Sequence, residues 1–468
     1  MELKIKDVKQ LEFILFLKEM VKKTVFEGHI FLVGGYVRDC ILEKTPHDID
    51  IAVDIPNGGV GFAMWLAYNT GCFTNGTNPV IFSGFGTAKL RITSIEQYEG
   101  IEIECVQTRK EQYHKESRNP STVFGTIEED ASRRDFTINA LYYDISNDRI
   151  LDPTHKGFSD LASHIIRSCG KPDIIFEDDP LRIIRAIRFS TQLGWKIEKD
   201  TWTGMIVNSK RLLILSQERV TDELNKILLC KNPSNGINKM LLCGILDKVL
   251  PAVSQYRSIF QTPKAKYTLY EHTLNTLDKT QPILINRLAA LFHDIGKLFT
   301  YEKGFLFHST IGADKVKELL IAMKYSKDVS NKVSTIVEHH EDFSCFNSSS
   351  TPGNAKIRKF SANFEDEDTL MSALDVINAD VTSQYYTKKV RLVPTIQQRL
   401  REMKEKGESI NKIVLPVNGN DIMNEFNLKK GPFIGTLLDE IKKKVLEKPD
   451  LTKNEAFQTV ENYIKKVV

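Results

Sequence analysis

A short apolar run that ends in two glycines, followed by two spaced aspartates, is the feature that most constrains this chain. Residues 30–33 predict a strand that breaks at Gly34 and Gly35, where a helix is expected to begin. Backbone amides at such a turn can approach a phosphate, and the helix dipole favours negative charge there. Asp48 and Asp50 lie two residues apart, so in a strand both carboxylates share one face and can bind a divalent cation. A phosphate cradle beside a metal site indicates phosphoryl or nucleotidyl transfer, whereas each half alone could be a tight turn or a solvated strand.

Length and composition restrict the class of protein. A chain of 468 residues is too long for one compact core, so several domains are expected. Its seven cysteines are scattered without a C-x-x-C pair, which argues against a Cys-type zinc site and a disulfide framework. The net charge is only +3, so any basic surface for nucleic acid must be local. Without a signal peptide or a membrane-spanning apolar run, the expected location is the cytoplasm.

The residue pattern changes from mixed to helical near residue 150. Strand-like runs at 30–33, 49–53, 87–92, 101–106 and 140–145 indicate an α/β or α+β unit around one sheet. Beyond residue 152 the apolar spacing is helical, as in 181–189 and 218–229. We expect four parts: a head (1–150), a neck and body (151–262), a further helical domain (263–390) and a helical tail (391–468).

A third carboxylate for the metal site is expected on the run at 101–106. Glu102 and Glu104 alternate with Ile101 and Ile103, so the two acids share the face opposite the isoleucines. An amphipathic edge strand would show the same alternation. Beside Asp48 and Asp50, we favour Glu104 as the residue that acts on the attacking hydroxyl or completes the metal coordination.

Two later segments combine arginines with acids. In residues 130–141, Arg133 and Arg134 beside Asp135 can clamp a triphosphate or ribose, and Asn139 can bind a hydroxyl. A solvated helix start with a salt bridge is the alternative for this segment.

The second segment, residues 177–189, places Asp179 and Arg182 three positions apart at a helix start marked by Pro180. Such a pair can hydrogen-bond the edge of a base, because the carboxylate accepts from an amino group and the guanidinium donates to a ring nitrogen or carbonyl. The alternative is an intrahelical ion pair.

Several of the ten histidines occur in an order typical of a metal site. His293 and Asp294 end an apolar helix near Gly296, so both side chains can meet a metal where the backbone turns away. Taken singly, each histidine could be a packed or exposed side chain. In the same ordered series, His272 precedes this pair, and His308, His339, His340 and Asp380 follow it. A mixed His/carboxylate set suits Mn²⁺, Ni²⁺, Co²⁺ or Mg²⁺ better than a structural zinc.

The ordered segments 32–39 (LVGGYVRD), 48–50 (DID), 133–141 (RRDFTINAL), 178–189 (DDPLRIIRAIRF) and 216–224 (SQERVTDEL) resemble the class II tRNA nucleotidyltransferase and bacterial poly(A) polymerase family. The resemblance covers residues 1 to about 230. It implies an α+β polymerase-β-type head with a mixed sheet, followed by a helical neck, body and tail. One departure is visible, because the family often has Glu where Asp178 stands in this chain.

The family resemblance also implies roles for particular residues. Gly34 and Gly35 would bind the triphosphate, while Asp48 and Asp50 would hold two Mg²⁺ ions. Asp179 and Arg182 would form an amino-acid template for CTP and ATP, since cytosine and adenine present an amino donor beside a ring-nitrogen acceptor. The other expected nucleotide-binding residues are Arg38, Arg133, Arg134, Asp135, Asn139, Arg185, Arg188 and Arg219. Arg133, Arg134 and Asp135 would sense the ribose, and Arg219 would support the template helix.

The histidine order, with the motif HDIGK at 293–297, resembles the HD phosphohydrolase superfamily. This resemblance implies a helical HD domain in which His272, His293, Asp294 and Asp380 are primary ligands. His308, with His339 or His340, would bind a second metal or the substrate phosphate. Beside a tRNA nucleotidyltransferase, the domain would act as a 2′,3′-cyclic phosphodiesterase or phosphatase on RNA ends, or serve only as architecture.

The leading hypothesis is addition of CCA to the 3′ end of tRNA from CTP and ATP, with contacts to the acceptor arm. Tail segments 415–421 and 431–435 resemble those of HD-containing tRNA nucleotidyltransferases and favour it. The head and neck motifs do not separate CCA addition from poly(A) addition or from partial CC- or A-addition. An HD phosphohydrolase with a head that only binds nucleotide is a further alternative, against which the intact pair of Asp48 and Asp50 counts. The last alternative is a non-catalytic RNA-binding protein.

Overall fold

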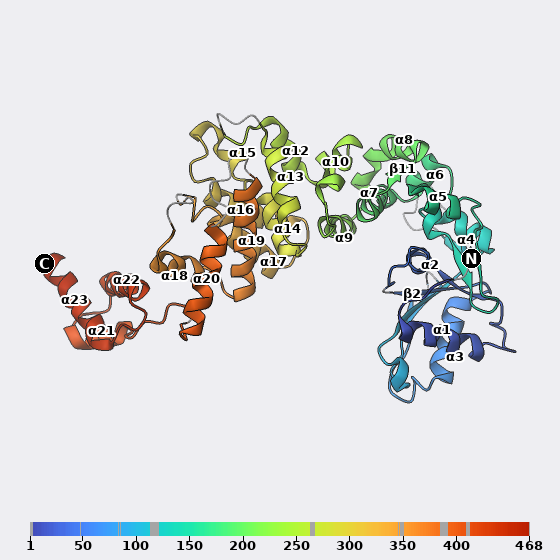
Figure 1. Cartoon of the computed structure of the whole chain (residues 1–468), viewed down its shortest axis with the longest axis horizontal. Helices are drawn as coiled ribbons and strands as arrows, with labels where there is room; N and C mark the ends of the chain where they lie inside the picture. The colour runs from blue at the N-terminus through green and yellow to red at the C-terminus, as the bar shows by residue number, and fades with distance from the viewer. Residues whose placement is uncertain are drawn as a thin grey trace. The chain divides into compact units, whose positions relative to one another are not determined.

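The computed structural model describes residues 3–46, 48–82, 84, 86–112, 121–262, 267–344, 346, 351–383, 392–408 and 412–467. The chain forms two compact units (Figure 1). Unit 1 comprises Met1–Leu215 with Leu242–Ile245, and unit 2 comprises Ser216–Leu241 with Leu246–Val468. Among the described residues, no helix is both long enough and apolar enough to cross a membrane.

A seven-stranded mixed sheet organises the head, in the order β3-β4-β5-β2-β1-β8-β9. Its strands are β1 (Ile30–Val33), β2 (Ile49–Val53), β3 (Val80–Phe82), β4 (Thr87–Arg91), β5 (Glu102–Gln107), β8 (Tyr142–Asp144) and β9 (Arg149–Leu151). β2 and β5 are parallel, whereas the other neighbouring pairs are antiparallel. All five expected strands are present, and the α+β fold with a mixed sheet is confirmed. β3 and β9 were not expected because each has only three residues, too few for an alternating pattern.

Helices cover this sheet: α1 (Val8–Met20), α2 (Gly35–Ile41), α3 (Gly58–Asn69) and α4 (Ile127–Arg133). α3 buries Phe62 and Leu66 and lies against β4 and β5. A Cβ atom at Gly59 would stand 2.3 Å from the carbonyl oxygen of Gly86, so glycine is required for this close approach. A separate two-stranded sheet is formed by β6 (Arg109–Gln112) and β7 (Ser121–Phe124).

The remainder of unit 1 is mostly helical, as expected. It contains α5 (Gly157–Ser163), α6 (Pro172–Asp178), α7 (Leu181–Leu193), α8 (Lys199–Asn208) and the 3-10 helix η4 (Ser209–Ile214). The neck and body were expected to be wholly helical, but β10 (Ile165–Ile166) and β11 (Lys196–Ile197) form a short parallel pair. Two residues per strand carry no periodic signal, so the sequence could not reveal this pair.

Unit 2 is helical among its described residues. Its first helices are α9 (Gln217–Leu228), α10 (Ser234–Leu242), α11 (Leu246–Val249), α12 (Pro251–Gln255), α13 (Leu269–Lys279), α14 (Leu284–Phe292), α15 (Lys297–Thr300) and α16 (His308–Ala322). They are followed by α17 (Lys327–His339), α18 (Asn354–Ser361), α19 (Glu367–Ser383), α20 (Leu392–Glu405), α21 (Gly419–Phe426), α22 (Pro432–Glu447) and α23 (Lys453–Val467). The last three share a core built around Leu437, Ile441 and Val460.

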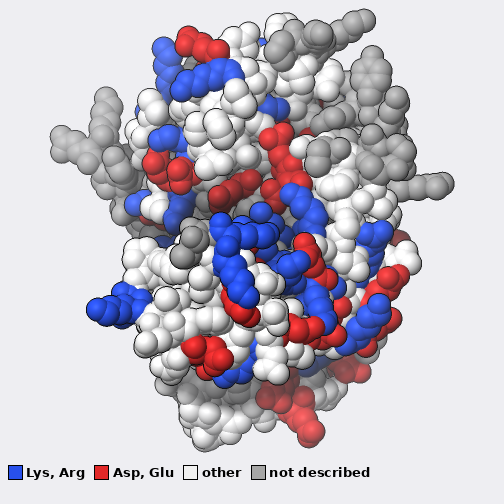
Figure 2. All heavy atoms as spheres, turned by 90° about the vertical axis from the view of Figure 1, so that its left-hand side faces the viewer, with Lys and Arg blue, Asp and Glu red and all other residues white. Residues whose placement is uncertain are grey.

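Some basic side chains lie close together on the surface. Figure 2 shows Lys and Arg side chains gathered in the middle of the visible face, with acidic side chains among and around them. In unit 2, α22 carries three consecutive exposed lysines, Lys442, Lys443 and Lys444. Lys443 and Lys444 each pair with a glutamate of the same helix.

Candidate active sites

Three carboxylates meet on one face of the head sheet. Ile49 and Ile51 of β2 are buried, so Asp48 and Asp50 lie on the opposite face. In the parallel register of β2 and β5, Asp50 is the direct partner of Glu104. Lys89 of β4 is the next partner along this line, and its Nζ lies 2.9 Å from a Glu104 carboxylate oxygen. The structure therefore brings together the three acids that the sequence suggested, and it adds a lysine.

The electrostatics of these carboxylates fit a divalent cation. Burial of Asp50, together with repulsion from Glu104 and Asp48, raises its pKa to about 6, although Arg134 and Lys89 favour the ionised form. A cation bound by hard oxygen ligands removes this repulsion, and an all-oxygen donor set is the kind that Mg²⁺ prefers. Asp48, Asp50 and Glu104 are therefore suited to Mg²⁺.

The glycine turn lies directly beside this site. Gly34 ends β1 with φ +70°, a conformation that L-residues rarely adopt, and α2 begins at Gly35. A Cβ atom at Gly34 would stand 3.3 Å from Oδ2 of Asp50 and 3.9 Å from a terminal nitrogen of Arg134. The bare backbone of Gly34 thus adjoins both the metal-site carboxylate and a cation.

Arg133 and Arg134 are held by the buried carboxylate of Asp130. Arg134 Nε donates to Asp130 Oδ2 at 3.0 Å and to the Tyr142 hydroxyl at 2.9 Å, while Arg133 Nε donates to Asp130 Oδ1 at 3.0 Å. Burial opposes ionisation of Asp130, but Arg134 and Arg133 outweigh it and lower its pKa to about 2. The salt bridge considered for this segment is present, yet it lies in the interior and fixes Arg134 beside Gly34.

A second buried network joins the head to α7. Asp135 Oδ2 accepts from Arg185 Nε at 2.9 Å, and Asp135 Oδ1 accepts from Asn139 Nδ2 at 3.2 Å. Asn139 Oδ1 in turn accepts from Arg38 at 2.7 Å. Burial alone would raise the pKa of Asp135, but the neighbouring guanidinium of Arg185 outweighs it and lowers this pKa to about 2. These side chains hold α7 against the head whether or not they also contact nucleotide.

Asp179 and Arg182 lie at the junction of two helices. Asp179 caps the end of α6 with an extended backbone, Pro180 precedes α7, and Arg182 belongs to the first turn of α7. The sequence placed both residues on one helix; the break at Asp179 follows from Pro180, which disfavours helical geometry in the preceding residue. Arg182 is 9% exposed, and its Nη1 donates to the carbonyl of Ile175 at 3.4 Å.

Two further arginines, Arg188 and Arg219, were also expected to bind nucleotide. The Arg188 guanidinium stands 4.1 Å from the ring centre of Phe189, also on α7. Arg219 is exposed on α9 and belongs to unit 2. Its expected support of the template helix stays a prediction.

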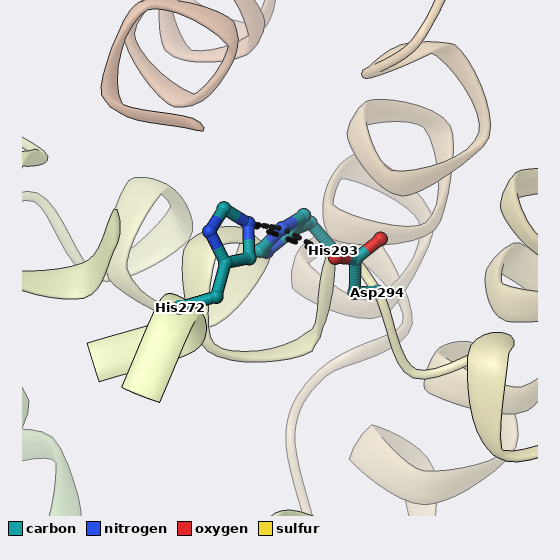
Figure 3. Close-up of side chains that lie close together, drawn as sticks. All are labelled: His272, His293 and Asp294. Atoms are coloured by element: carbon teal, nitrogen blue, oxygen red, sulfur yellow. Dashed lines mark hydrogen bonds and ion pairs between the residues drawn. The ribbon is translucent and has the colours of Figure 1, made fainter. Parts of the chain in front are cut away.

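The second site is a buried histidine–aspartate cluster in unit 2. His272 comes from α13, and His293 and Asp294 follow the last turn of α14 (Figure 3). The two imidazole Nε2 atoms are 3.1 Å apart, and His293 Nε2 lies 3.1 Å from Asp294 Oδ2. Asp380 of α19 adds a carboxylate oxygen 2.9 Å from His272 Nε2. The four expected primary ligands are thus brought together.

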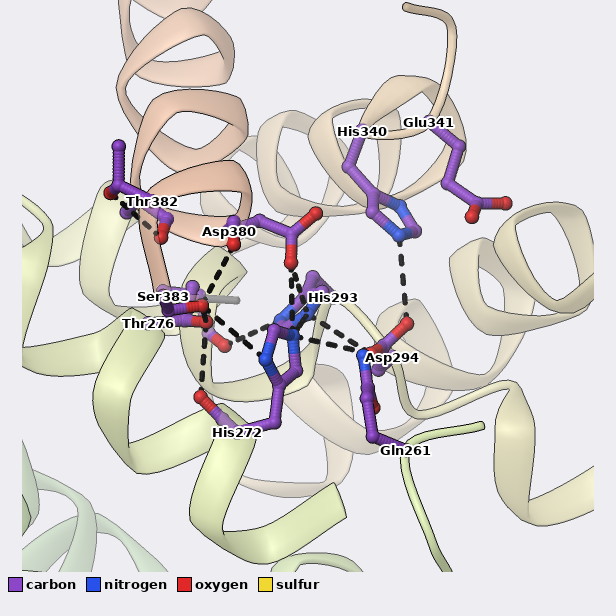
Figure 4. Close-up of polar contacts among 12 residues, drawn as sticks. Gln261, His272, Thr276, His293, Asp294, His340, Glu341, Asp380, Thr382 and Ser383 are labelled. Carbon is purple, nitrogen blue, oxygen red and sulfur yellow. Dashed lines mark hydrogen bonds and ion pairs between the residues drawn. The ribbon is translucent and has the colours of Figure 1, made fainter. Parts of the chain in front are cut away.

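Asp294 also faces a second pair of imidazoles through its other oxygen. Asp294 Oδ1 lies 3.2 Å from His308 Nε2 and 3.6 Å from His340 Nε2 (Figure 4). His339 lies outside the cluster, because its Nδ1 is 3.2 Å from an Asp342 oxygen. Of the two histidines that the sequence left open, the structure favours His340. Asp294 is therefore shared by two groups of candidate ligands.

The hydrogen bonds of the ring nitrogens favour a metal in this cluster. Nδ1 of His293, His308 and His340 bonds a backbone carbonyl, at 2.9, 2.9 and 2.6 Å respectively. A carbonyl only accepts, so each Nδ1 carries a proton and each Nε2 faces inward, where it offers a lone pair once the ring is neutral. Burial disfavours a charged His293, but Asp294 and Asp380 outweigh it and raise its pKa to about 9. The carboxylates that favour positive charge and the inward Nε2 atoms both fit a bound cation, and the mixed donor set suits Mn²⁺, Ni²⁺, Co²⁺ or Mg²⁺.

Gly296 makes the cluster possible. A Cβ atom at Gly296 would stand 1.9 Å from the carbonyl oxygen of His308 and 2.8 Å from the amide nitrogen of Gly312. Only a glycine lets the turn after Asp294 touch the start of α16, where His308 lies. The second glycine, Gly312, continues this close packing of backbones.

The sequence reasoning missed three polar side chains at the cluster. Lys297 Nζ and Gln261 Nε2 donate to Asp294 Oδ2 at 2.9 and 3.0 Å, and a Glu341 oxygen lies 3.4 Å from His308 Nε2. Lys297 stands one helical turn after Asp294, so its spacing could have identified it. Gln261 is separated from Asp294 by 33 residues, and no local signal indicates its role.

Three protein families match successive parts of the chain. The poly A polymerase head domain matches residues 30–167, and a probable RNA- and SrmB-binding site of polymerase A matches residues 194–257. A putative domain 2 of tRNA nucleotidyltransferase matches residues 304–459. None of the three is an HD phosphohydrolase family.

Individual proteins with similar sequences and folds agree with these matches. A mitochondrial CCA tRNA nucleotidyltransferase of Candida glabrata is 33% identical over 47% of this chain, although the match spans only 43% of that protein. A tRNA nucleotidyltransferase of Schizosaccharomyces pombe is 26% identical over 92% of this chain and 90% of its own length. The crystal structure of the Bacillus stearothermophilus CCA-adding enzyme in complex with CTP has a TM-score of 0.71 at 20% identity and covers 98% of this chain and 99% of that one. This likeness shows a shared fold.

Proposed function

Because the chain belongs to the class II CCA-adding enzyme family, a family of nucleotidyltransferases, we propose that it adds CCA to the 3′ end of tRNA from CTP and ATP without a nucleic-acid template. The observation that carries the proposal is the alignment of Asp50 with Glu104 beside Gly34. Acidic ligands for a cation and a bare backbone turn for a triphosphate adjoin each other there. A solved relative from Thermotoga maritima is complexed with tRNA, which agrees with tRNA as the partner.

In the proposed reaction, the 3′-hydroxyl oxygen of the RNA forms a bond to the α-phosphorus of the nucleotide. The bond from that phosphorus to the bridging oxygen breaks, and pyrophosphate leaves. Glu104 would act on the attacking hydroxyl or complete the metal coordination, while Gly34, Gly35 and Arg134 would hold the triphosphate. Asp48 and Asp50 would hold Mg²⁺, which would supply charge stabilisation for the reaction.

Base choice is assigned to the junction of α6 and α7. Asp179 accepts from the exocyclic amino group of cytosine or adenine, and Arg182 donates to the neighbouring ring nitrogen. Uracil and guanine present a carbonyl oxygen toward the carboxylate and are therefore disfavoured. One residue pair can serve both CTP and ATP, which accounts for addition without a nucleic-acid template.

The proposed function predicts the length of the product. With tRNA that lacks its 3′ end, CTP and ATP together should give addition of three nucleotides, and CTP alone should give two. Gel electrophoresis of the extended tRNA at single-nucleotide resolution measures both. A long A tail would identify a poly(A) polymerase, and an extension that stops at CC, or that needs a CC end, would identify a partial enzyme.

A second activity is favoured by the imidazole lone pairs that converge on Asp294. We propose that this cluster, loaded with Mn²⁺, Ni²⁺, Co²⁺ or Mg²⁺, hydrolyses 2′,3′-cyclic phosphates or terminal phosphates of RNA. In the cyclic case a water oxygen forms a bond to phosphorus, one ring P–O bond breaks, and the released ribose oxygen takes a proton. Lys297, whose Nζ lies 2.9 Å from Asp294 Oδ2, would bind the substrate phosphate.

Substitution at Asp294 tests this second activity. We expect Asp294→Ala to reduce hydrolysis of 2′,3′-cAMP by at least about 10³-fold with every divalent metal, because both groups of candidate ligands share this carboxylate. His339→Ala is the matched control, since His339 lies outside the cluster, and it should retain activity. Wild-type protein without hydrolysis in any metal would show that the cluster is architectural.

The cytoplasm stays the expected compartment. Two similar proteins are mitochondrial by name, so fractionation of the source cells is the direct measurement.

A further inference from the structure

An exposed aromatic segment borders the histidine–aspartate cluster. We define the aromatic segment as residues 299–307, the end of α15 and the turn that leads into α16. Phe299, Tyr301, Leu306 and Phe307 are between 55% and 73% exposed. Single exposed apolar side chains are normal, but four within nine residues form the kind of patch that marks a binding surface.

The backbone of this segment is strained where it meets the cluster. Phe305 and Phe307 have φ +67° and +61°, a region that bulky side chains rarely adopt. Such a conformation is unfavourable for a bulky side chain and persists only where the surrounding structure holds it. The carbonyl oxygen of Phe305 accepts from both the backbone N–H and Nδ1 of His308, at 3.2 and 2.9 Å. The turn therefore orients His308, but this role does not require exposed rings.

A line of contacts leads from the cluster to the exposed ring of Tyr301. Lys297 Nζ lies 2.9 Å from Asp294 Oδ2 and 5.6 Å from the centre of the Phe305 ring. The Phe305 ring is half-buried and meets the Tyr301 ring edge to face, with centroids 5.7 Å apart. A phosphate bound at Lys297 would therefore have aromatic faces beside it, outside the cluster.

We propose that the aromatic segment binds the base of the nucleotide whose phosphate occupies the cluster. This inference rests on the proposed phosphohydrolase function and defines its substrate class: nucleoside phosphates and the 3′ ends of single-stranded RNA, as opposed to simple sugar phosphates. Aromatic side chains stack on bases without sequence preference, because every base has a π face. In such a site the Lys297 ammonium binds the phosphate, and the rings of the aromatic segment stack on the base.

The test measures binding with and without a base. In Mn²⁺, calorimetry compares adenosine 3′-monophosphate with ribose 5-phosphate, and each titration is repeated in Asp294→Ala to subtract binding elsewhere in the chain. Phe307→Asn removes the ring, while asparagine tolerates positive φ and keeps the turn that orients His308. Tyr301→Ala removes the second ring, and Tyr68→Ala, an exposed tyrosine of unit 1, is the matched control.

Base stacking predicts that Phe307→Asn and Tyr301→Ala each weaken the binding of adenosine 3′-monophosphate by about fivefold or more. Binding of ribose 5-phosphate should be unchanged in these variants. Phe307→Trp should retain the wild-type affinity for adenosine 3′-monophosphate, and Tyr68→Ala should have no effect. Equal affinities of wild type for the two ligands, or unchanged binding in both ring variants, would overturn the proposal. Self-association that Phe307→Asn abolishes would also overturn it, because the segment would then be an interface between copies of the chain.

A second measurement separates this inference from the activity on which it rests. Wild type is assayed on 2′,3′-cAMP and on the base-free 1-O-methylribose 2′,3′-cyclic phosphate. Preference for the nucleotide that Phe307→Asn removes supports both claims. Equal hydrolysis of the two compounds supports the phosphohydrolase and overturns base recognition. Base-dependent binding without hydrolysis supports the aromatic site and overturns the hydrolytic function.

Discussion

Asp50→Asn is expected to abolish nucleotide addition to tRNA while making the metal-free protein more stable. Catalysis should fall by about 10³-fold or more, because a carboxylate that binds the metal supplies several kcal/mol of transition-state stabilisation. Incorporation of labelled CMP into tRNA that lacks its 3′ end measures this loss. Asparagine keeps the shape of the side chain, so the loss reports the charge.

The gain in stability follows from the pKa of Asp50. Burial and the neighbouring carboxylates raise this pKa to about 6 in the folded protein, above the value of about 4 in an unfolded chain. A carboxyl group with a raised folded pKa binds its proton more tightly when folded, so its ionisation destabilises the fold. The penalty is absent below about pH 4, grows up to about pH 6 and is then constant, at no more than about 3 kcal/mol.

Urea denaturation in EDTA checks the second part of the prediction. Asp50→Asn should be more stable than wild type at pH 7.5, and the difference should vanish at pH 4. Addition of Mg²⁺ should reduce this difference in the free energy of unfolding, because the ion stabilises only the wild type. A variant that is less stable than wild type at pH 7.5 would contradict this account of the site.

Glu102→Gln is the matched control for the third carboxylate. Glu102 lies on the same strand as Glu104, two residues earlier, and its side chain is 73% exposed beside Arg91. Glu104→Gln should slow addition strongly, whereas Glu102→Gln should leave it close to wild type. The reverse order would transfer the role to Glu102.

The face of each head strand could be predicted, but its neighbours could not. Alternation with Ile49 and Ile103 reveals which side Asp50 and Glu104 occupy, because side chains of a strand point to opposite faces in turn. The sequence does not reveal that β2 and β5 are parallel partners, because 48 residues lie between the end of β2 and the start of β5. Lys89 was missed for the same reason: its importance depends on the register between β4 and β5.

The histidine–aspartate cluster could also be predicted only in part from the sequence. The motif at 293–297 predicts that His293 and Asp294 act together, and the structure places His272 and Asp380 beside them. Adjacent residues at a helix end point in different directions, so the sequence could not choose between His339 and His340. The choice depends on how α17 packs, and only His340 at its end faces Asp294.

Arg182→Ala is expected to remove most of the discrimination among the four nucleotides. A site built to hydrogen-bond one pattern rejects the wrong one by up to about 10⁴-fold, because mismatched polar groups stay unpaired. Without the guanidinium, the ring nitrogen of cytosine or adenine loses its hydrogen-bond donor. The site then no longer presents the donor and acceptor pattern that disfavours uracil and guanine. The ratio of kcat/KM for CTP to that for UTP, measured on tRNA lacking CCA, should fall toward unity by at least about 10²-fold.

The position of Arg182 supports a specific effect. Its side chain is 9% exposed, and it is oriented by the carbonyl of Ile175 on the preceding helix. Arg182→Lys should fail to restore selectivity, because a lysine retains the charge but lacks the planar fork of donors. Arg211→Ala is the control, since this arginine is largely exposed and pairs only loosely with Glu177 at 3.8 Å. Unchanged selectivity in Arg182→Ala would rule out the amino-acid template, whereas equal losses for all four nucleotides would assign Arg182 to binding of the shared triphosphate or ribose.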